Sequence, residues 1–387
     1  MREDCGGAPV NNRYAHVDAL RALAVLVVVV GHAGLGHVVP GGSGVTIFFA
    51  ISGFIITTVL LKEWKKTSGF DLGGFYVRRM VKLLPPMIVV LVIPTLIYAM
   101  WAHIDWYAFT GQVFFFFNWM MPYNPDVLPG SGPVWSLSIE EQFYIVFALL
   151  WVWLARSRNA LPWLTGVAVA AVLVATTLRV VLADPGNAIA ADRIYYGSDT
   201  RADSLAWGIL AAVVLYRWQQ SEADGRWRRL AGSTCALFGA AGIFLVSVAI
   251  RDDWFQQTFR YSAQSVATCV VILYGLLATG TQVHRWFSTI SGFRIIQVIG
   301  LASYSIYLVH LGLVRIVMDK SASLPLALTS FIAVVVAVSA GVLLYWVVEV
   351  PARAGYDRIR DRRARRAATG PRTVAPSATE AVADGHR

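Results

Sequence analysis

Long apolar segments separated by short polar ones run through almost the whole chain. Ten of these segments are long enough, or nearly so, to cross about 30 Å of hydrocarbon as a helix. Their approximate limits are 17–37, 44–62, 81–102, 134–154, 161–183, 203–217, 230–250, 261–280, 298–318 and 324–348. The pattern therefore predicts an all-α fold, a polytopic membrane helix bundle of about ten transmembrane helices.

The composition excludes an ordinary soluble domain. Of the 387 residues, 57% are hydrophobic and only 14% are charged, whereas a soluble domain carries roughly 25% charged residues. We therefore expect a multi-pass protein of the cell membrane, with the lipid bilayer as a constant partner.

The distribution of Lys and Arg predicts the orientation of the bundle. The connections between the apolar segments form two alternating sets. The set that contains both termini holds 25 of the 33 Lys and Arg residues, whereas the other set holds 5. Since cytoplasmic loops carry the excess of positive charge, the sequence predicts an even number of spans with both termini cytoplasmic.

The formal net charge of +10 is explained by this orientation and by one basic tail. The tail holds the arginine-rich run 358–366 and becomes rich in Pro, Ala, Thr and Ser after Gly370. We interpret the run as a segment attracted to anionic lipid rather than to nucleic acid, and the rest is typical of disorder. The predicted division is a membrane domain over 1–352 and a basic, disordered cytoplasmic tail over 353–387.

Cysteine and metal chemistry are not expected. The three cysteines, Cys5, Cys235 and Cys269, are far apart and form no CxxC pair. Neither a disulfide framework nor a metal site is predicted from them.

The first apolar segment carries ionisable residues, which are expensive inside a membrane and usually functional. Asp18, Arg21 and His32 fall on nearly one helix face, with Arg21 and His32 roughly 16 Å apart. One interpretation of His32 is a hydrogen bond to a neighbouring helix. The other is a general base, because burial disfavours the charged imidazolium and a neutral ring can accept a proton from a hydroxyl or from water.

Three cations, Arg78, Arg79 and Lys82, lie within five residues at the cytoplasmic mouth of a span. Topogenic charge explains them in part. A receptor for a polyphosphate is the functional interpretation, since guanidinium binds phosphate bidentately.

Two carboxylates, Glu140 and Glu141, enter an apolar helix near its outer N-terminal end, where the helix dipole favours negative charge. Adjacent side chains on a helix point about 100° apart, so at most one glutamate is expected to face a site.

Five further residues fit either a packing or a substrate-binding role. Ser52 and Gly53 allow close helix packing or open space beside a ligand. Asp203 belongs to an Asp/Arg/Asp cluster that also fits a paired network at the membrane interface. Tyr307 and His310 share one helix face, where they also fit interhelical hydrogen bonds.

The order and spacing of these residues resemble the motifs of the acyltransferase-3 family of integral membrane acyltransferases. The resemblance covers roughly residues 14–352. It rests on the motifs at 18–24 with His32, 48–55, 75–79, 135–141, 303–310, and Glu349 with Pro351. This chain has Ala19 where the family has Gly, and Lys82 where a third Arg is usual, which keeps the charge but weakens a bidentate contact.

The resemblance implies an acyl-CoA donor from the cytoplasm, a hydroxyl acceptor, and His32 as the essential membrane histidine. On this basis Arg78, Arg79 and Lys82 bind the phosphates of coenzyme A, and Arg21 lies deeper on the path. Acyl-CoA is then a co-substrate, and no permanently bound cofactor is expected.

In the mechanism that follows, His32 removes a proton from the acceptor hydroxyl, and the oxygen attacks the thioester. Glu140 or Asp18 is expected to orient the histidine or to balance its charge. A route through an acylated side chain is equally compatible.

The acceptor is expected to be a hydroxylated small molecule or a glycan. The overall look of the chain is similar to stand-alone macrolide O-acyltransferases, which makes a macrolide in antibiotic biosynthesis the first expectation. O-acetylation of a cell-surface glycan or glycolipid is the alternative. A small-molecule transporter is the alternative of another class, but transporters usually have related halves or paired broken helices, which this sequence lacks.

Overall fold

The computed structural model describes residues 14–67, 69–220, 225–321 and 323–368, and every regular element within these ranges is helical. The first half contains α1 (Ala15–Val30), α2 (Gly41–Thr67), α3 (Leu72–Met87), α4 (Ile93–Tyr98), α5 (Trp106–Val113), α6 (Val134–Leu154), α7 (Ala160–Leu182), α8 (Ala188–Tyr196) and α9 (Ser198–Gln220). The second half contains α10 (Gly225–Ala231), α11 (Thr234–Ala249), α12 (Asp253–Gln257), α13 (Arg260–Leu277), α14 (Gln282–Gly292), α15 (Arg294–Leu301), α16 (Ser303–Lys320), α17 (Leu326–Leu344) and α18 (Val350–Ala368). The predicted all-α fold is confirmed.

Several helices continue into π-helical segments or adjoin short 3₁₀ turns. The π-helical segments η1 (Gly31–Leu35), η2 (Ile88–Val92) and η5 (Tyr345–Glu349) extend α1, α3 and α17. The 3₁₀ turns η3 (Phe117–Trp119) and η4 (Met121–Tyr123) lie in the connection before α6.

Within the described ranges, six helices are long and apolar enough to cross a membrane, and nine are if each strongly bent helix pair counts as one span. The bent pairs are α10 with α11, α13 with α14, and α15 with α16. The remaining predicted span, 203–217, lies within α9, which packs against α2, α7 and α13. The predicted multi-pass membrane bundle is confirmed.

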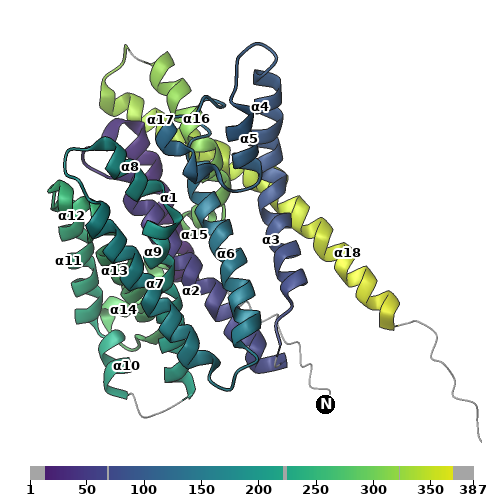
Figure 1. The fold of residues 1–387 in the computed structure, drawn as a ribbon, viewed down its shortest axis with the longest axis vertical. Coiled ribbons are helices and arrows are strands. Elements are labelled where there is room, and N and C mark those ends of the chain that lie inside the picture. Colours follow the sequence, from purple (N-terminus) through teal and green to yellow (C-terminus); the bar gives the residue numbers. More distant parts are fainter. Residues whose placement is uncertain (1–13, 68, 221–224, 322, 369–387) are drawn as a thin grey trace, which may run out of the picture.

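The connections gather at two ends of the bundle (Figure 1). Helices α10 and α14, which carry arginines such as Arg228 and Arg285, lie at one end, and α4, α5 and α8 lie at the other. This separation agrees with the orientation predicted from the charges. We therefore refer to the first as the cytoplasmic end and to the second as the outer end.

Helices α2 and α9 cross at very short range. A Cβ atom on Gly53 would lie 2.0 Å from the carbonyl oxygen of Leu205, and one on Gly208 would lie 2.2 Å from that of Ala50. Only glycines permit this approach. The prediction that Gly53 opens space beside a ligand is therefore wrong, because the space is filled by the backbone of α9.

Asp203 is engaged in a buried ion pair. Both of its carboxylate oxygens accept hydrogen bonds from Arg179 of α7, at 2.7 and 2.8 Å. The hydroxyl of Ser262 on α13 donates to the same carboxylate at 2.6 Å, and Arg179 and Asp203 are fully buried. Asp203 therefore joins three helices, and this structural contact replaces its predicted contact with substrate. Its partner is Arg179 of α7 rather than the arginine of the predicted Asp/Arg/Asp cluster.

The tail predicted to be disordered begins as a helix. α18 follows η5 directly and extends away from the bundle (Figure 1). Arg and Ala are good helix formers, and the preceding helix removes the need for a new nucleus. The prediction of disorder is wrong for residues 353–368, and residues 369–387 lie outside the described part of the chain.

Candidate active site

Three cavities follow one another through the bundle. We call them the entrance cavity, about 200 Å³ at the cytoplasmic end, the central cavity, about 60 Å³, and the outer cavity, about 250 Å³. Arg21 and Lys82 line both the entrance and the central cavities. Val45 and Tyr307 line both the central and the outer cavities. Neighbouring cavities are therefore separated by shared side chains.

The entrance cavity is basic. Arg21, Lys82 and Arg353 line it, together with the single carboxylate of Asp18. Arg353 also binds Glu349, one turn earlier on the same helix. The predicted cations Arg21 and Lys82 are thus brought together from α1 and α3, and Arg353 adds a third that the sequence motifs do not indicate.

Arg78 has a different position from its neighbours. Its guanidinium lies 4.0 Å from Asp71 at the surface, and 44% of its side chain is exposed. Successive residues of a helix face different directions. Arg78 therefore does not line the three cavities, and its role in binding phosphate at the cytoplasmic face stays a prediction.

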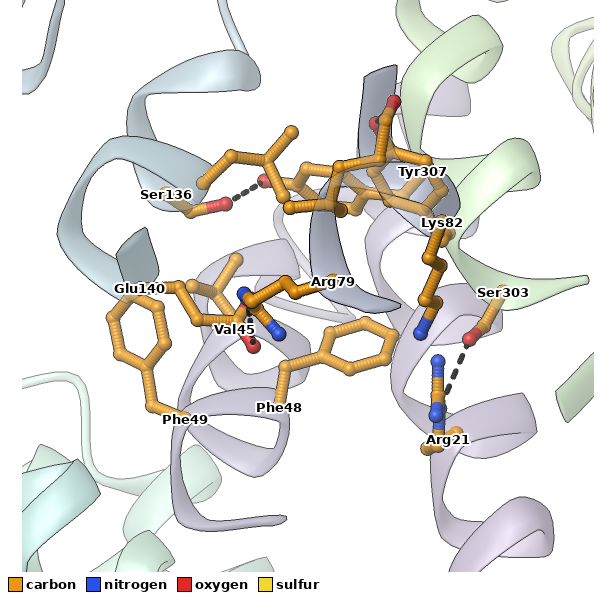
Figure 2. Close-up of a pocket in the computed structure, with 13 residues that line it drawn as sticks. Arg21, Val45, Phe48, Phe49, Arg79, Lys82, Ser136, Glu140, Ser303 and Tyr307 are labelled. Atoms are coloured by element: carbon orange, nitrogen blue, oxygen red, sulfur yellow. Dashed lines mark hydrogen bonds and ion pairs between the residues drawn. The ribbon is translucent and has the colours of Figure 1, made fainter. Parts of the chain in front are cut away.

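The central cavity contains a compact ionic cluster (Figure 2). Arg79 Nε donates to Glu141 Oε1 at 2.5 Å, and its Nη2 lies 3.4 Å from Glu140 Oε1. Ser52 and Tyr144 donate to Glu140 at 2.5 and 2.8 Å. The two glutamates have different positions. Glu140 lines the cavity, whereas the Glu141 side chain is only 2% exposed and forms an ion pair with Arg79.

Arg21 and Lys82 lie toward the other side of the central cavity (Figure 2). Arg21 Nε donates to the hydroxyl of Ser303, the first residue of α16, at 3.2 Å. The motifs at the start of α1 and at the start of α16, 282 residues apart, thus meet in one cavity.

Tyr307 lies between the central and the outer cavities. Its hydroxyl is 2.8 Å from that of Ser136 and donates to the carbonyl oxygen of Pro133 at 3.0 Å. Figure 2 shows Ser136 and Tyr307 facing each other across the cavity. The Tyr307 side chain therefore forms part of the boundary between the two cavities.

His32 lies in the outer cavity, at the corner between α1 and α2. It belongs to η1, where α1 ends, and its side chain is exposed to the cavity. The chain then returns so closely that a Cβ on Gly31 would lie 2.9 Å from the carbonyl oxygen of Val39. This tight corner fixes the backbone that carries His32.

A second histidine orients His32. His310 Nδ1 lies 2.6 Å from the carbonyl oxygen of Tyr307, which can only accept, so this nitrogen carries the proton. His310 Nε2 is then an acceptor, 3.3 Å from His32 Nδ1, which also lies 2.9 Å from the carbonyl oxygen of Val28. His32 Nδ1 must therefore carry the proton, which leaves His32 Nε2 free to accept one.

The predicted partners of His32 are corrected by this arrangement. Asp18 is fourteen positions away on the same helix, about 21 Å, and Glu140 binds Arg79 in the central cavity. Neither orients His32. His310 is fully buried and contacts His32, so its predicted contact with substrate is replaced by contact with the candidate base.

Aromatic side chains form one wall of the outer cavity. Trp135 lies 4.8 Å from Tyr195 and 5.0 Å from Tyr196, measured between ring centroids, and all three line the cavity with Arg315. Sequence reasoning missed these tyrosines because they lie in a connection between spans. Arg315 belongs to none of the motifs identified from the sequence, although a charge within a span is itself a functional signal.

The sequence of this molecule matches a known family over nearly all of the membrane bundle. Residues 14–349 match the family Acyl_transf_3, described as an acyltransferase domain. The chain belongs to the acyltransferase-3 family. Membership of this family supports acyltransferase activity. The matched range contains every residue that lines the three cavities except Arg353.

Several bacterial proteins are similar to this acyltransferase-3 chain. It is 30% identical over 318 residues to the peptidoglycan O-acetyltransferase OatA of Listeria monocytogenes, covering 78% of this chain and 49% of the relative. It is 28% identical to the putative peptidoglycan O-acetyltransferase YrhL of Bacillus subtilis, covering 76% and 47%. A putative O-acetyltransferase of Staphylococcus aureus is 26% identical, covering 78% and 50%. The chain thus spans about half the length of these curated relatives, and no solved structure matches it.

Proposed function

We propose that this protein is a membrane O-acetyltransferase that moves an acetyl group from acyl-CoA at the cytoplasmic side to a glycan hydroxyl at the outer side. The observation that carries the proposal is the row of three cavities, which leads from a basic mouth to His32. A donor and an acceptor that approach from opposite sides would meet at its outer part.

The donor end is the entrance cavity. Arg21, Lys82 and Arg353 offer three cations to the phosphates of coenzyme A, and guanidinium groups bind phosphate bidentately. The thin, partly apolar pantetheine arm would extend through the central cavity past Tyr307. Since Arg21 and His32 lie about 16 Å apart along α1, an extended arm would bring the thioester near His32.

The transfer step uses His32 as a general base. Its Nε2 takes the proton from the acceptor hydroxyl while the oxygen attacks the thioester carbonyl carbon. The carbon–sulfur bond then breaks, and His32 returns the proton to the departing thiolate, so that coenzyme A leaves as the thiol and the imidazole is neutral again. An ester and free coenzyme A are the products, so atoms and charges balance.

A glycan suits the acceptor end better than a macrolide. Two of the relatives are named for peptidoglycan, which favours the alternative acceptor over the first expectation. The aromatic wall of the outer cavity offers flat apolar faces with polar tips, a surface on which a sugar ring can stack. His32 also lies near the outer end, where a surface glycan is accessible.

The test is acetyl transfer by the purified protein in sealed vesicles of known orientation. Acetyl-CoA is supplied on the cytoplasmic side. The other side receives either peptidoglycan glycan strands without their peptides or a macrolide. We expect acetylated glycan outside and free coenzyme A inside. His32→Ala should lower the rate by roughly 10² to 10⁴, whereas His37→Ala, an exposed histidine of the neighbouring turn, should not.

Each other outcome has a distinct meaning. Acetylation of the macrolide alone would reject the glycan. Full activity of a folded His32→Ala variant would reject the mechanism. Uptake of substrate without release of coenzyme A would indicate a transporter instead.

A further inference from the structure

Arg315 is a cation in the outer cavity that the proposed transfer step does not use. It lies on α16, one turn after Leu311, and both residues line the cavity together with His32. A guanidinium within a membrane helix is expensive unless it is paired or functional. Its position beside the candidate base raises the question of what it binds.

No described residue makes a hydrogen bond or an ion pair with Arg315. Other cations around the bundle do have partners: Arg193 pairs with Asp199, and Arg353 pairs with Glu349. Asp319 lies one turn further along α16, yet its carboxylate is more than 4 Å from the guanidinium. More than a third of the Arg315 side chain is exposed.

The cavity itself offers no counter-ion. Among the described residues that line it, none is Asp or Glu. Its polar groups are the imidazole of His32, the phenols of three tyrosines and the indole of Trp135. Among these lining residues Arg315 carries the formal positive charge, and such a charge favours an anionic ligand.

We propose that the outer cavity selects an acceptor sugar that carries an anionic group, a carboxylate or a phosphate, and that Arg315 pairs with this group. The sugar ring would stack on Trp135 and Tyr195, its hydroxyl would face His32, and its anion would meet the planar guanidinium, which binds either anion bidentately. The inference rests on the proposed function and names the chemical class of its acceptor.

Two matched pairs of acceptors test the inference in the vesicle assay. One pair is the methyl glycoside of N-acetylmuramic acid and its carboxyl methyl ester. The other is N-acetylglucosamine 1-phosphate and methyl N-acetylglucosaminide. Comparison of kcat/KM within each pair isolates the anion, and comparison between pairs distinguishes the carboxylate from the phosphate.

We expect the wild type to prefer the charged member of at least one pair by roughly 10- to 100-fold, the range of a charge-assisted contact. Arg315→Gln should abolish this preference, mainly through a higher KM for the charged member, so that kcat/KM falls much further for the charged member than for the neutral one. Arg315→Lys should keep part of the preference. Lys320→Gln removes a charge from the outer end of the same helix and should change neither value.

Several results would overturn the inference. A wild type without charge preference would reject it, as would an Arg315→Gln variant that loses activity equally toward both members of a pair. The latter would assign Arg315 to the donor, the transition state or the fold. Transfer to none of the four sugars by the wild type would instead overturn the proposed glycan acceptor, and this inference with it.

Discussion

In the central cavity, the charges of Arg79, Glu140 and Glu141 are paired with one another, whereas in the outer cavity Arg315 has no partner among the described residues. The two cavities are neighbours and share Val45 and Tyr307. The central one is narrow and held by a network, and the outer one is about four times larger. The difference is that paired charges hold the shape of the central cavity, whereas the outer cavity contains a cation without a counter-ion among the residues that line it.

The two cavities differ in whether a buried charge is paired with another protein group. A cluster that satisfies its own charges gains rigidity, and its members are costly to remove one at a time. A cation left without a counter-ion gains most from a ligand that brings one. Three substitutions, taken from the largest expected effect to the smallest, test this contrast.

The largest effect is expected for Arg79→Gln, because it leaves Glu141 buried without its partner. We expect a loss of about 3 to 5 kcal/mol in the free energy of unfolding, measured as thermal unfolding in detergent. Arg78→Gln, next to it in sequence but exposed, should change stability by about 0.5 kcal/mol or less. The double variant Arg79→Gln/Glu141→Gln should regain part of the loss. If Arg79→Gln and Arg78→Gln unfold at the same temperature, the central network does not stabilise the fold.

An intermediate effect is expected for His310. His310→Leu removes one of the two acceptors of His32 Nδ1 and leaves the carbonyl oxygen of Val28. Misorientation of a catalytic group costs up to about 100-fold in kcat. Gln places its amide oxygen where the histidine has Nε2, so His310→Gln should recover much of the rate. The KM for acetyl-CoA should not change in either variant. If Leu and Gln give the same kcat, His310 has a packing role only.

The smallest effect is expected at the boundary between the cavities. Tyr307→Phe removes the hydrogen bonds to Ser136 and Pro133, worth about 1 kcal/mol. Easier movement of the ring should raise acceptor-independent release of coenzyme A by about fivefold, the ratio that this energy represents. Tyr304→Phe, which loses a hydrogen bond to the carbonyl oxygen of Leu83 instead, is the control. Unchanged release by Tyr307→Phe would show that the boundary does not limit passage.

Some of the candidate site could be read from the sequence. The intramembrane charges of α1 identify Arg21 and His32, and the structure has them in connected cavities. The cations before Pro85 were identified as a group, but helical rotation sends Arg78 outward and Arg79 inward. Which of two adjacent side chains faces a cavity depends on the rotation of α3 within the bundle, and that is set by its neighbours.

The roles of Gly53 and Asp203, by contrast, could not be predicted from the sequence. A small residue or a carboxylate in a span fits both packing and binding, and only the neighbouring helix decides between them. The backbone of α9 fills the space at Gly53, and the Asp203 carboxylate is paired with Arg179. Their partners lie in distant segments, so no local pattern identifies them.

The membrane bundle could be predicted from the sequence alone and is confirmed, and the orientation that places His32 near the outer end stays a prediction from the charges. These follow from transfer free energies, which add residue by residue along each segment. Only the tertiary structure decided that His32 meets His310 across 278 residues, that the glutamates hold Arg79, and that Arg315 shares a cavity with His32. Contacts of this kind depend on distances of a few ångströms between side chains, and these distances exist only once the helices have packed.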